Sequence, residues 1–314
     1  MGTKCCGWWR RDAWEEPQHV IDQEVLARLQ FGAGYFAWLL PLLLLEGAVL
    51  GWQRSFLFRL SRWKEHGSTL CDLIVSSLFI FGLSSWLGNL FTFGALGMVQ
   101  QLAGVAPKFD VAGVVPHPAL RWLLYFILID FSDYWLHRAM HRWAPLWKLH
   151  SFHHAATEFN ILTGNRIHFT EDALMVAGRA IVLAPLAISL PEVIGVVMVR
   201  RVIDQLQHSE LAWSYGTVGR TLVMSPLHHR LHHSSHPDDY RANFGNIFVW
   251  WDRLFGSYRH PDGSRAIELG TDSAKFDREV ALHPFRMMVV LQFEAMRDVG
   301  RVAGRGLRRI SKTR

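Results

Sequence analysis

Three clusters of histidines constrain this chain more than any other feature of its sequence. Of its seventeen histidines, twelve lie between positions 137 and 236. They form the motifs HRAMH (137–141), HSFHH (150–154) and HHRLHH (228–233). The spacing HxxxH and the twice-used spacing HxxHH each place imidazoles on one face of a helix. Neutral imidazole binds borderline transition metals, and these motifs offer more nitrogens than one metal accepts, so the pattern predicts two metals in one histidine-lined site.

Long apolar stretches predict a membrane protein. Hydrophobic residues make up 50% of the chain and charged residues 19%, below the roughly 25% typical of soluble domains. Four stretches are expected in a bilayer: 34–52, 69–90, 120–136 and 173–199. Prolines interrupt the last one, which leaves a re-entrant or two-helix hairpin as an alternative to a straight span. The expected fold class is all-α, an integral membrane helical bundle with a cytoplasmic histidine-rich helical cap that holds a di-metal site.

Basic residues set the expected orientation. Lys and Arg follow the first apolar stretch, flank the first two histidine motifs and fill the C-terminus. Positive residues favour the cytoplasmic side, so we expect a multi-pass protein with its active site on that side. The net charge of +6 does not predict nucleic-acid binding, because the basic residues flank apolar stretches. The three cysteines form neither a disulfide framework nor a metal motif.

Two aspartates precede histidines by four residues, one helical turn. A metal-bound imidazole usually donates its second N–H to a carboxylate or a carbonyl. We therefore expect Asp133 to accept from His137, and Asp204 to accept from His208. The alternative for Asp133 is that it only caps or solvates the end of a helix.

Other residues near the motifs are candidates for supporting roles. Arg166 and His168, in NRIHFTE (165–171), are expected either to brace the site or to contact a lipid head group. His228 lies outside the HxxHH frame, and a ligand, a supporting residue and a base are all open for it. His236 and His260 match no spacing and are expected to be ordinary.

The motifs in this order resemble the sterol desaturase and fatty acid hydroxylase superfamily, whose members are integral membrane di-iron enzymes that hydroxylate or desaturate lipids. The resemblance covers residues 70–260 and rests on DFSDYWLHRAMHR (130–142), LWKLHSFHH (146–154), SPLHHRLHHS (225–234) and NFGNIFVWWDRLFGSY (243–258). It implies that Asn243 and Asp252 fix the loop after the last histidine motif. It also implies iron ligation by His137, His141, His150, His153, His154, His208, His229, His232 and His233.

The resemblance and the motifs together predict a membrane-bound oxygenase that uses two non-haem irons and O2 to hydroxylate a bilayer lipid, with desaturation as the alternative outcome. The sequence shows no flavin or haem motif, so electrons are expected from a separate protein. The catalytic domain is expected at 33–270, between an N-terminal tail (1–32) and a basic C-terminal tail (271–314). Two other classes stay open. One is a zinc-dependent membrane hydrolase, which needs only three protein ligands and an open position. The other is a non-catalytic membrane metal-binding protein.

Overall fold

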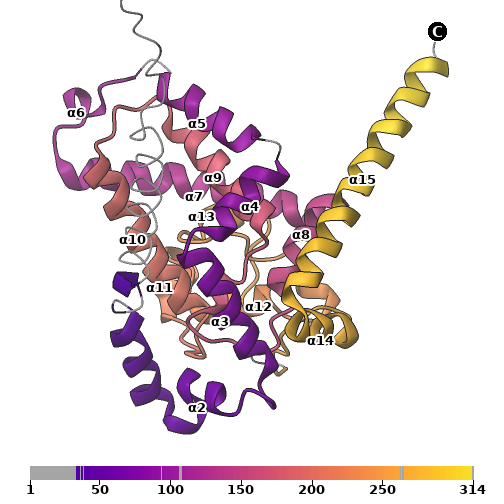
Figure 1. Ribbon diagram of the computed structural model, residues 1–314. Coiled ribbons are helices and arrows are strands. Elements are labelled where there is room, and N and C mark those ends of the chain that lie inside the picture. The colour runs from indigo at the N-terminus through magenta and orange to yellow at the C-terminus, as the bar shows by residue number, and fades with distance from the viewer. Residues whose placement is uncertain are drawn as a thin grey trace, which may run out of the picture.

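The computed structural model is built from helices joined by loops (Figure 1). It describes residues 33–35, 37, 39–92, 94–105, 108–261, 263 and 265–312. Over these residues the chain forms isolated β-bridges but no strand. The all-helical part of the predicted fold class is therefore confirmed, while the expected N-terminal tail (1–32) lies outside the described residues.

An N-terminal helix, Ala33–Leu50, precedes the labelled elements. The α-helices that follow are α2 (Phe56–Ser61), α3 (Gly67–Ile80), α4 (Leu83–Phe91), α5 (Ala95–Val105), α6 (Val111–Val114), α7 (Pro118–Arg142), α8 (Ala144–His154), α9 (Phe169–Leu183), α10 (Leu190–Gln207), α11 (Gly216–Thr221), α12 (Pro226–His232), α13 (Trp250–Leu254), α14 (Ala274–Leu282) and α15 (Pro284–Lys312). Short 3-10 helices are η2 (Trp52–Arg54), η3 (Thr163–Asn165) and η4 (Pro237–Asp239).

The four expected membrane stretches form helices of different kinds. Among the described residues, Ala33–Leu50 is the one helix long and apolar enough to cross a membrane. The stretch 69–90 divides into α3 and α4 at Gly82, which has a positive φ of 74°. The stretch 173–199 divides into α9 and α10, so it does not form one straight helix. The stretch 120–136 is the apolar part of α7, which continues into the first histidine motif.

Helix α7 is the element on which the site is built. It starts at Pro118, where a missing N–H costs nothing, and runs for 25 residues. Gly178 of α9 and Gly195 of α10 lie against it so closely that a Cβ at either position would collide with a side chain of α7. Since α7 contacts α8, α9 and α10, it fixes these helices around the first histidine motif.

The third histidine motif lies on a short helix with a defined start. Ser225 caps α12 by accepting a hydrogen bond from the backbone N–H of His228, and Pro226 occupies the first helical position. The helix ends at His232, so the six residues of the motif occupy its last turns and its end. Helix α12 contacts α10, which carries His208 at its C-terminal end.

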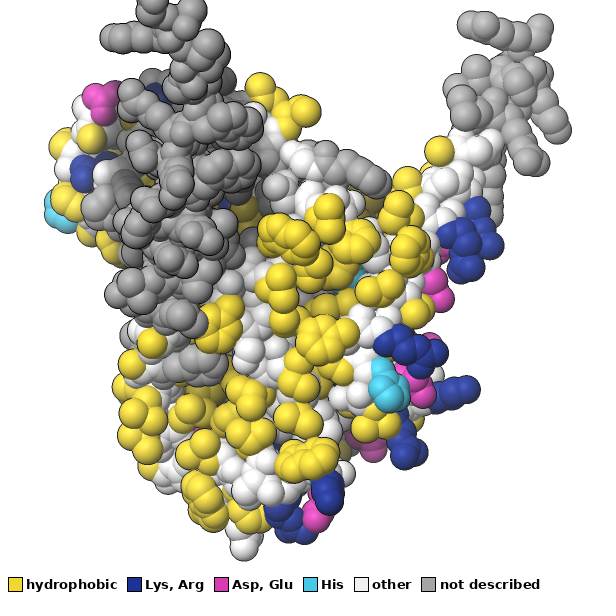
Figure 2. All heavy atoms as spheres, viewed as in Figure 1, with side chains coloured by type: hydrophobic (Ala, Val, Ile, Leu, Met, Phe, Trp, Pro, Cys, Tyr) yellow, Lys and Arg dark blue, Asp and Glu magenta, His cyan; other side chains and the backbone are white. Residues whose placement is uncertain are grey.

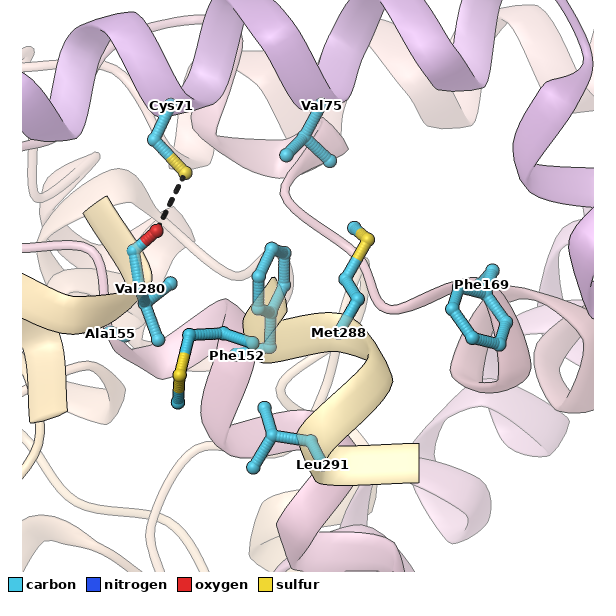
Figure 3. Packing of buried hydrophobic residues seen from close by; sticks show 9 residues of the cluster. Cys71, Val75, Phe152, Ala155, Phe169, Val280, Met288 and Leu291 are labelled. Atoms are coloured by element: carbon cyan, nitrogen blue, oxygen red, sulfur yellow. Dashed lines mark hydrogen bonds between the residues drawn. The ribbon is translucent and has the colours of Figure 1, made fainter. Parts of the chain in front are cut away.

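A buried apolar core lies behind the second histidine motif (Figure 3). Phe152, inside HSFHH, is fully buried, and burying a phenylalanine contributes about 1.5–3 kcal/mol. The core joins α8 to α3, α9, α14 and α15 through Cys71, Val75, Ala155, Phe169, Val280, Met287, Met288 and Leu291. Residues 274–312 of the expected C-terminal tail thus form two helices, and α15 packs directly on α8.

Candidate metal centre

The structure brings together the nine histidines that the resemblance implied as ligands, in two neighbouring groups. Within each group the candidate ligand nitrogens all lie within 4.8 Å of one another. The first group is His137, His141, His150, His154 and His232, and the second is His153, His208, His229 and His233. The rings of His154 and His233 stack at 4.2 Å, so the two groups share a boundary. Each HxxHH motif contributes to both groups.

The ring nitrogens of the first group are free to bind a cation. All five Nε2 atoms are buried without a hydrogen-bond partner. On three of these rings Nδ1 donates to a fixed acceptor, which leaves Nε2 as a lone-pair donor to a metal. These hydrogen bonds run from His137 to the Phe244 carbonyl (2.9 Å), from His150 to Glu171 (2.7 Å) and from His232 to the Ala242 carbonyl (2.8 Å). Buried lone pairs without a partner are costly, so this donor set fits a metal ion.

The nitrogens of the second group face one another. Nε2 of His208 lies 3.2 Å from Nε2 of His153 and 2.9 Å from Nε2 of His229. Both ring nitrogens of His233 are buried without a hydrogen-bond partner. His208 and His153 donate through Nδ1 to backbone carbonyls, so their Nε2 atoms present lone pairs. Lone pairs that meet at such distances repel unless a proton or a cation lies between them.

Burial keeps these imidazoles neutral. Desolvation, followed by repulsion from neighbouring imidazolium charges, holds the pKa of His153, His154, His229 and His233 well below the usual 6.5. Burial lowers the pKa of His232 to about 3. Since neutral imidazole is the metal-binding form, the site can take up a metal at neutral pH without displacing protons from these rings.

One cavity touches both groups. It has a volume of about 70 Å³ and is lined by His137 and His150 of the first group and by His153, His208 and His229 of the second. The rest of its wall combines apolar, charged and polar residues, namely Met140, Ile167, Met175, Arg179, Arg200, Arg201, Glu171, Asp172, Asp204, Asn246 and Gly164. Two surface pockets are larger. The pocket of about 600 Å³ touches none of the nine histidines, and the pocket of about 690 Å³ touches one of them. The small cavity is therefore the place where a molecule could meet both groups.

Residues 122–257 match the fatty acid hydroxylase family, and this segment contains all nine histidines. This segment is similar to fatty acid hydroxylase domains. The resemblance predicted from the ordered motifs is thus confirmed. No solved structure matches the chain.

Several curated relatives are lipid oxidoreductases by name. Alkylglycerol monooxygenase of Danio rerio is 30% identical over 151 residues, which are 48% of this chain and 32% of that protein. Ornithine lipid hydroxylase of Rhizobium tropici is 27% identical over 190 residues, 55% of this chain and 57% of that protein. Delta(7)-sterol-C5(6)-desaturase of Nicotiana tabacum is 27% identical over 142 residues, 44% and 49% of the two chains. This chain therefore spans between 32% and 57% of the length of these relatives.

The expected hydrogen bond from His137 to Asp133 does not form in this domain. Asp133 accepts instead from Arg179 of α9 (2.8 Å) and from Arg200 of α10 (2.7 Å). The prediction was wrong because spacing along α7 does not reveal arginines on other helices. A charged guanidinium is a stronger donor to carboxylate than a neutral imidazole is. Asp133 therefore ties α7 to α9 and α10.

Asp204 lies beside His208, but its backbone is the closer partner. The Asp204 carbonyl accepts from Nδ1 of His208 at 2.8 Å, while the nearest carboxylate oxygen is 3.6 Å away. The carboxylate pairs instead with Arg201 at 3.3 Å. The acceptor is therefore the backbone carbonyl of Asp204 and not the carboxylate that the spacing led us to expect.

Arg166 and His168 are buried and do not face lipid. The Arg166 guanidinium donates to Asp72 of α3 at 2.6 Å and to the Ala155 carbonyl at the end of α8 at 3.1 Å. Nε2 of His168 donates to the Met288 carbonyl of α15 at 2.8 Å. The head-group alternative is therefore wrong for both residues, since each braces helices around the site.

His228 belongs to neither histidine group. Its ring contacts the Ser225 hydroxyl (2.6 Å), the Tyr258 hydroxyl (3.1 Å) and Nδ1 of His260 (3.1 Å). Burial lowers the pKa of His228 to about 4. His260, expected to be ordinary, is thus a partner of His228, a contact that no spacing in the sequence indicated.

The loop after α12 supplies two of the carbonyls that orient the histidines. Asn243 adopts a positive φ of 58° and donates to the His228 carbonyl at 3.1 Å. Asp252 accepts from the backbone N–H groups of Phe244 and Gly245 at 2.8 and 2.7 Å. These contacts fix the backbone of residues 242–245, whose carbonyls receive His232 and His137.

Two acidic residues support the site through hydrogen bonds that the sequence did not indicate. Glu171, in the first turn of α9, is the acceptor for His150. Asp130 is fully buried and accepts from the backbone N–H groups of Ile247 and Phe248 at 2.7 and 2.9 Å. The available signal for Asp130 was its place in an apolar stretch, where a carboxylate needs partners.

Proposed function

We propose that this chain is a membrane-bound di-iron oxygenase that hydroxylates a lipid, using O2 and electrons from a separate protein. One observation carries the proposal: nine histidines of a segment similar to fatty acid hydroxylase domains form two groups with unpartnered nitrogens, and both groups line one cavity. The names of the relatives, a monooxygenase, a hydroxylase and a desaturase that act on lipids, support the reaction class.

The donor set favours two irons. Structural zinc takes four ligands and catalytic zinc three protein ligands, whereas the first group alone offers five nitrogens. Imidazole suits iron as well as zinc and copper. We assign the first group to one iron and the second group to the other. When bound, the irons would supply the oxidising power that an unactivated C–H bond requires from O2.

The protein positions the histidines and shapes the cavity. Glu171 and the carbonyls of residues 242 and 244 hold three rings so that their Nε2 atoms point into the first group. Met140, Ile167 and Met175 give one part of the cavity wall an apolar surface that a substrate carbon could contact, while arginines and carboxylates line other parts. A cavity of about 70 Å³ admits only the reacting part of a lipid, so the remainder lies outside it.

The exposed apolar surface supports a membrane location. The most apolar window of helix Ala33–Leu50 is only 19% buried inside the protein, so most of it faces outward. Exposed side chains on other helices, such as Trp86, Leu90, Leu123 and Ile181, suit a lipid environment better than water. We propose an integral membrane protein whose catalytic unit comprises residues 33–270 together with α14 and α15, and whose site lies on the cytoplasmic side, where its basic flanks belong.

The test combines metal analysis with product analysis. Protein purified from iron-supplied cells should contain about two irons per chain, as the two histidine groups imply. Cells that express it under heavy-isotope O2 should gain a lipid with one added heavy oxygen atom, and cells that express His232→Ala should not. A lipid that instead loses two hydrogens would assign desaturation.

Two other results would contradict the proposal of a di-iron lipid hydroxylase. One zinc per chain, with activity retained in the absence of iron, would replace the proposal with a zinc-dependent hydrolase. Unchanged lipids in cells with iron, O2 and a competent reductant would leave a metal-binding protein without this activity.

A further inference from the structure

Helix α15 leaves a stripe of large apolar side chains uncovered. Phe285, Val289, Phe293 and Met296 follow one another at spacings of four, four and three residues, so they form one line along the helix. Each is more than 40% exposed, and Phe293 is 60% exposed. Val299 continues the line as the helix extends beyond the body of the protein (Figure 1).

The side of α15 that adjoins this stripe is fixed to the protein. Met288 and Leu291 are buried in the core with Phe152 of α8. Gln292 accepts a hydrogen bond from the Thr170 hydroxyl at 2.5 Å. Because these contacts hold the helix in one rotation, the apolar stripe cannot turn inward to become buried.

Positive charge borders the apolar stripe. Arg286, Arg297 and Arg301 are exposed beside it, and Arg286 and Arg301 also pair with Glu279 and Asp298. Figure 2 shows hydrophobic side chains over the face shared by α3, α4 and α15, with Lys and Arg interspersed with Asp and Glu along the outer edge of α15. Residues 299–314 contain six basic residues and no acidic one.

We propose that α15 lies in the surface of an anionic membrane, with its apolar stripe at the acyl-chain boundary and its basic edge on lipid head groups. A helix that combines an aromatic and aliphatic stripe with a basic flank binds the interface in this way. The helix carries too many charges for a span across the bilayer. A second copy of the chain is a poor occupant, since two basic C-terminal runs would repel each other.

The neighbouring surface is continuous with this assignment. Trp86 and Leu90 of α4, and Met98 and Leu102 of α5, are each more than half exposed. These residues and the stripe of α15 then face one lipid surface. Since α15 packs on α8, lipid contact lies directly behind the HSFHH motif. The inference rests on the membrane location proposed above, whereas its test is independent of turnover.

The experiment places an environment-sensitive fluorophore at single cysteines in the full chain, with Cys5 and Cys6 replaced by serine. Cys71 stays, because it is fully buried. Phe293→Cys reports on the stripe, Arg297→Cys on the basic edge, and Leu44→Cys on the N-terminal helix. Each variant is reconstituted into vesicles of phosphatidylcholine and phosphatidylglycerol, with nitroxide on the acyl chains or iodide in the water.

The probe at position 293 should be blue-shifted and lose most of its fluorescence to acyl-chain nitroxide, whereas the probe at 297 should respond to iodide. Iodide quenching at 293 as strong as at 297 would overturn the proposal, as would a blue-shifted probe that nitroxide lipid does not quench, because a protein would then cover the stripe. Quenching by nitroxide at 44 but not at 293 would confine the failure to α15. No quenching by nitroxide at either position would instead contradict the proposed membrane location of the whole protein.

Discussion

At the scale of single residues, the site depends on which nitrogen of each ring is already occupied. In the first group, three Nδ1 atoms donate to Glu171 or to carbonyls, while all five Nε2 atoms are left without partners. The motif spacings could predict that these histidines share a site, because each spacing places its histidines on one face of a helix. The acceptors could not be predicted, because they come from segments up to 107 residues away in sequence.

Replacing one candidate ligand should remove iron without unfolding the chain. We expect His232→Ala to lose bound iron and turnover, because one of the five nitrogens of the first group disappears. His236→Ala, four residues on and outside both groups, is the matched control and should keep both. Iron per chain and product formation are measured on the same preparations. Normal iron and activity in the His232 variant would remove that residue from the ligand set.

Glu171→Gln tests the acceptor of His150. The amide keeps the shape of the side chain but replaces a charged acceptor with a weaker neutral one. We expect a loss of roughly 10–100-fold in metal affinity or activity, the usual effect of changing a partner of a metal-bound histidine. Iron retention against increasing chelator gives the affinity. Retention equal to that of the parent protein would mean that Glu171 does not orient His150.

At the scale of elements, buried ion pairs hold helices that the sequence presents as separate stretches. Asp133 joins α7 to α9 and α10, and Arg166 joins α3 to the end of α8. Helix positions could be expected from apolar stretches and prolines, as the division between α9 and α10 illustrates. The ion pairs of Asp133 with arginines could not be expected from the sequence. An aspartate four residues before a histidine fits a hydrogen bond to a metal-bound imidazole just as well as it fits an ion pair.

Asp133→Asn should therefore lower stability rather than metal affinity. Removing one charge from a buried pair costs about 3–5 kcal/mol, and the partial exposure of Arg179 points to the lower end. Asp298→Asn, in a partly exposed pair with Arg301, should cost less than about 1 kcal/mol. Thermal unfolding and iron content are compared for both variants. Iron loss at unchanged stability in Asp133→Asn would restore the expected contact with His137.

At the scale of the whole molecule, the buried histidines make stability depend on pH. Their folded-state pKa values lie below the unfolded value of about 6.5, so the unfolded chain binds more protons once the pH falls below that value. Stability of the metal-free protein is then complete above pH of about 6.5 and lost on acidification, by roughly 1.4 kcal/mol per pH unit for each such histidine. Melting temperatures of chelator-treated protein between neutral and mildly acidic pH check this. A constant melting temperature would contradict it.

The C-terminal residues decide how far the catalytic unit extends. The basic composition of 271–314 suggested a tail, and the sequence alone could not show that α15 contributes Met288 and Leu291 to the core behind HSFHH. Truncation before Pro284 should thus uncover Phe152, remove the carbonyl that holds His168 and abolish iron binding. Truncation after Gly300 removes no core residue and should keep iron and melting temperature close to those of the full chain. Full iron content in the chain truncated before Pro284 would limit the catalytic unit to residues before Pro284, and would mean that α8 keeps its histidines in place without α15.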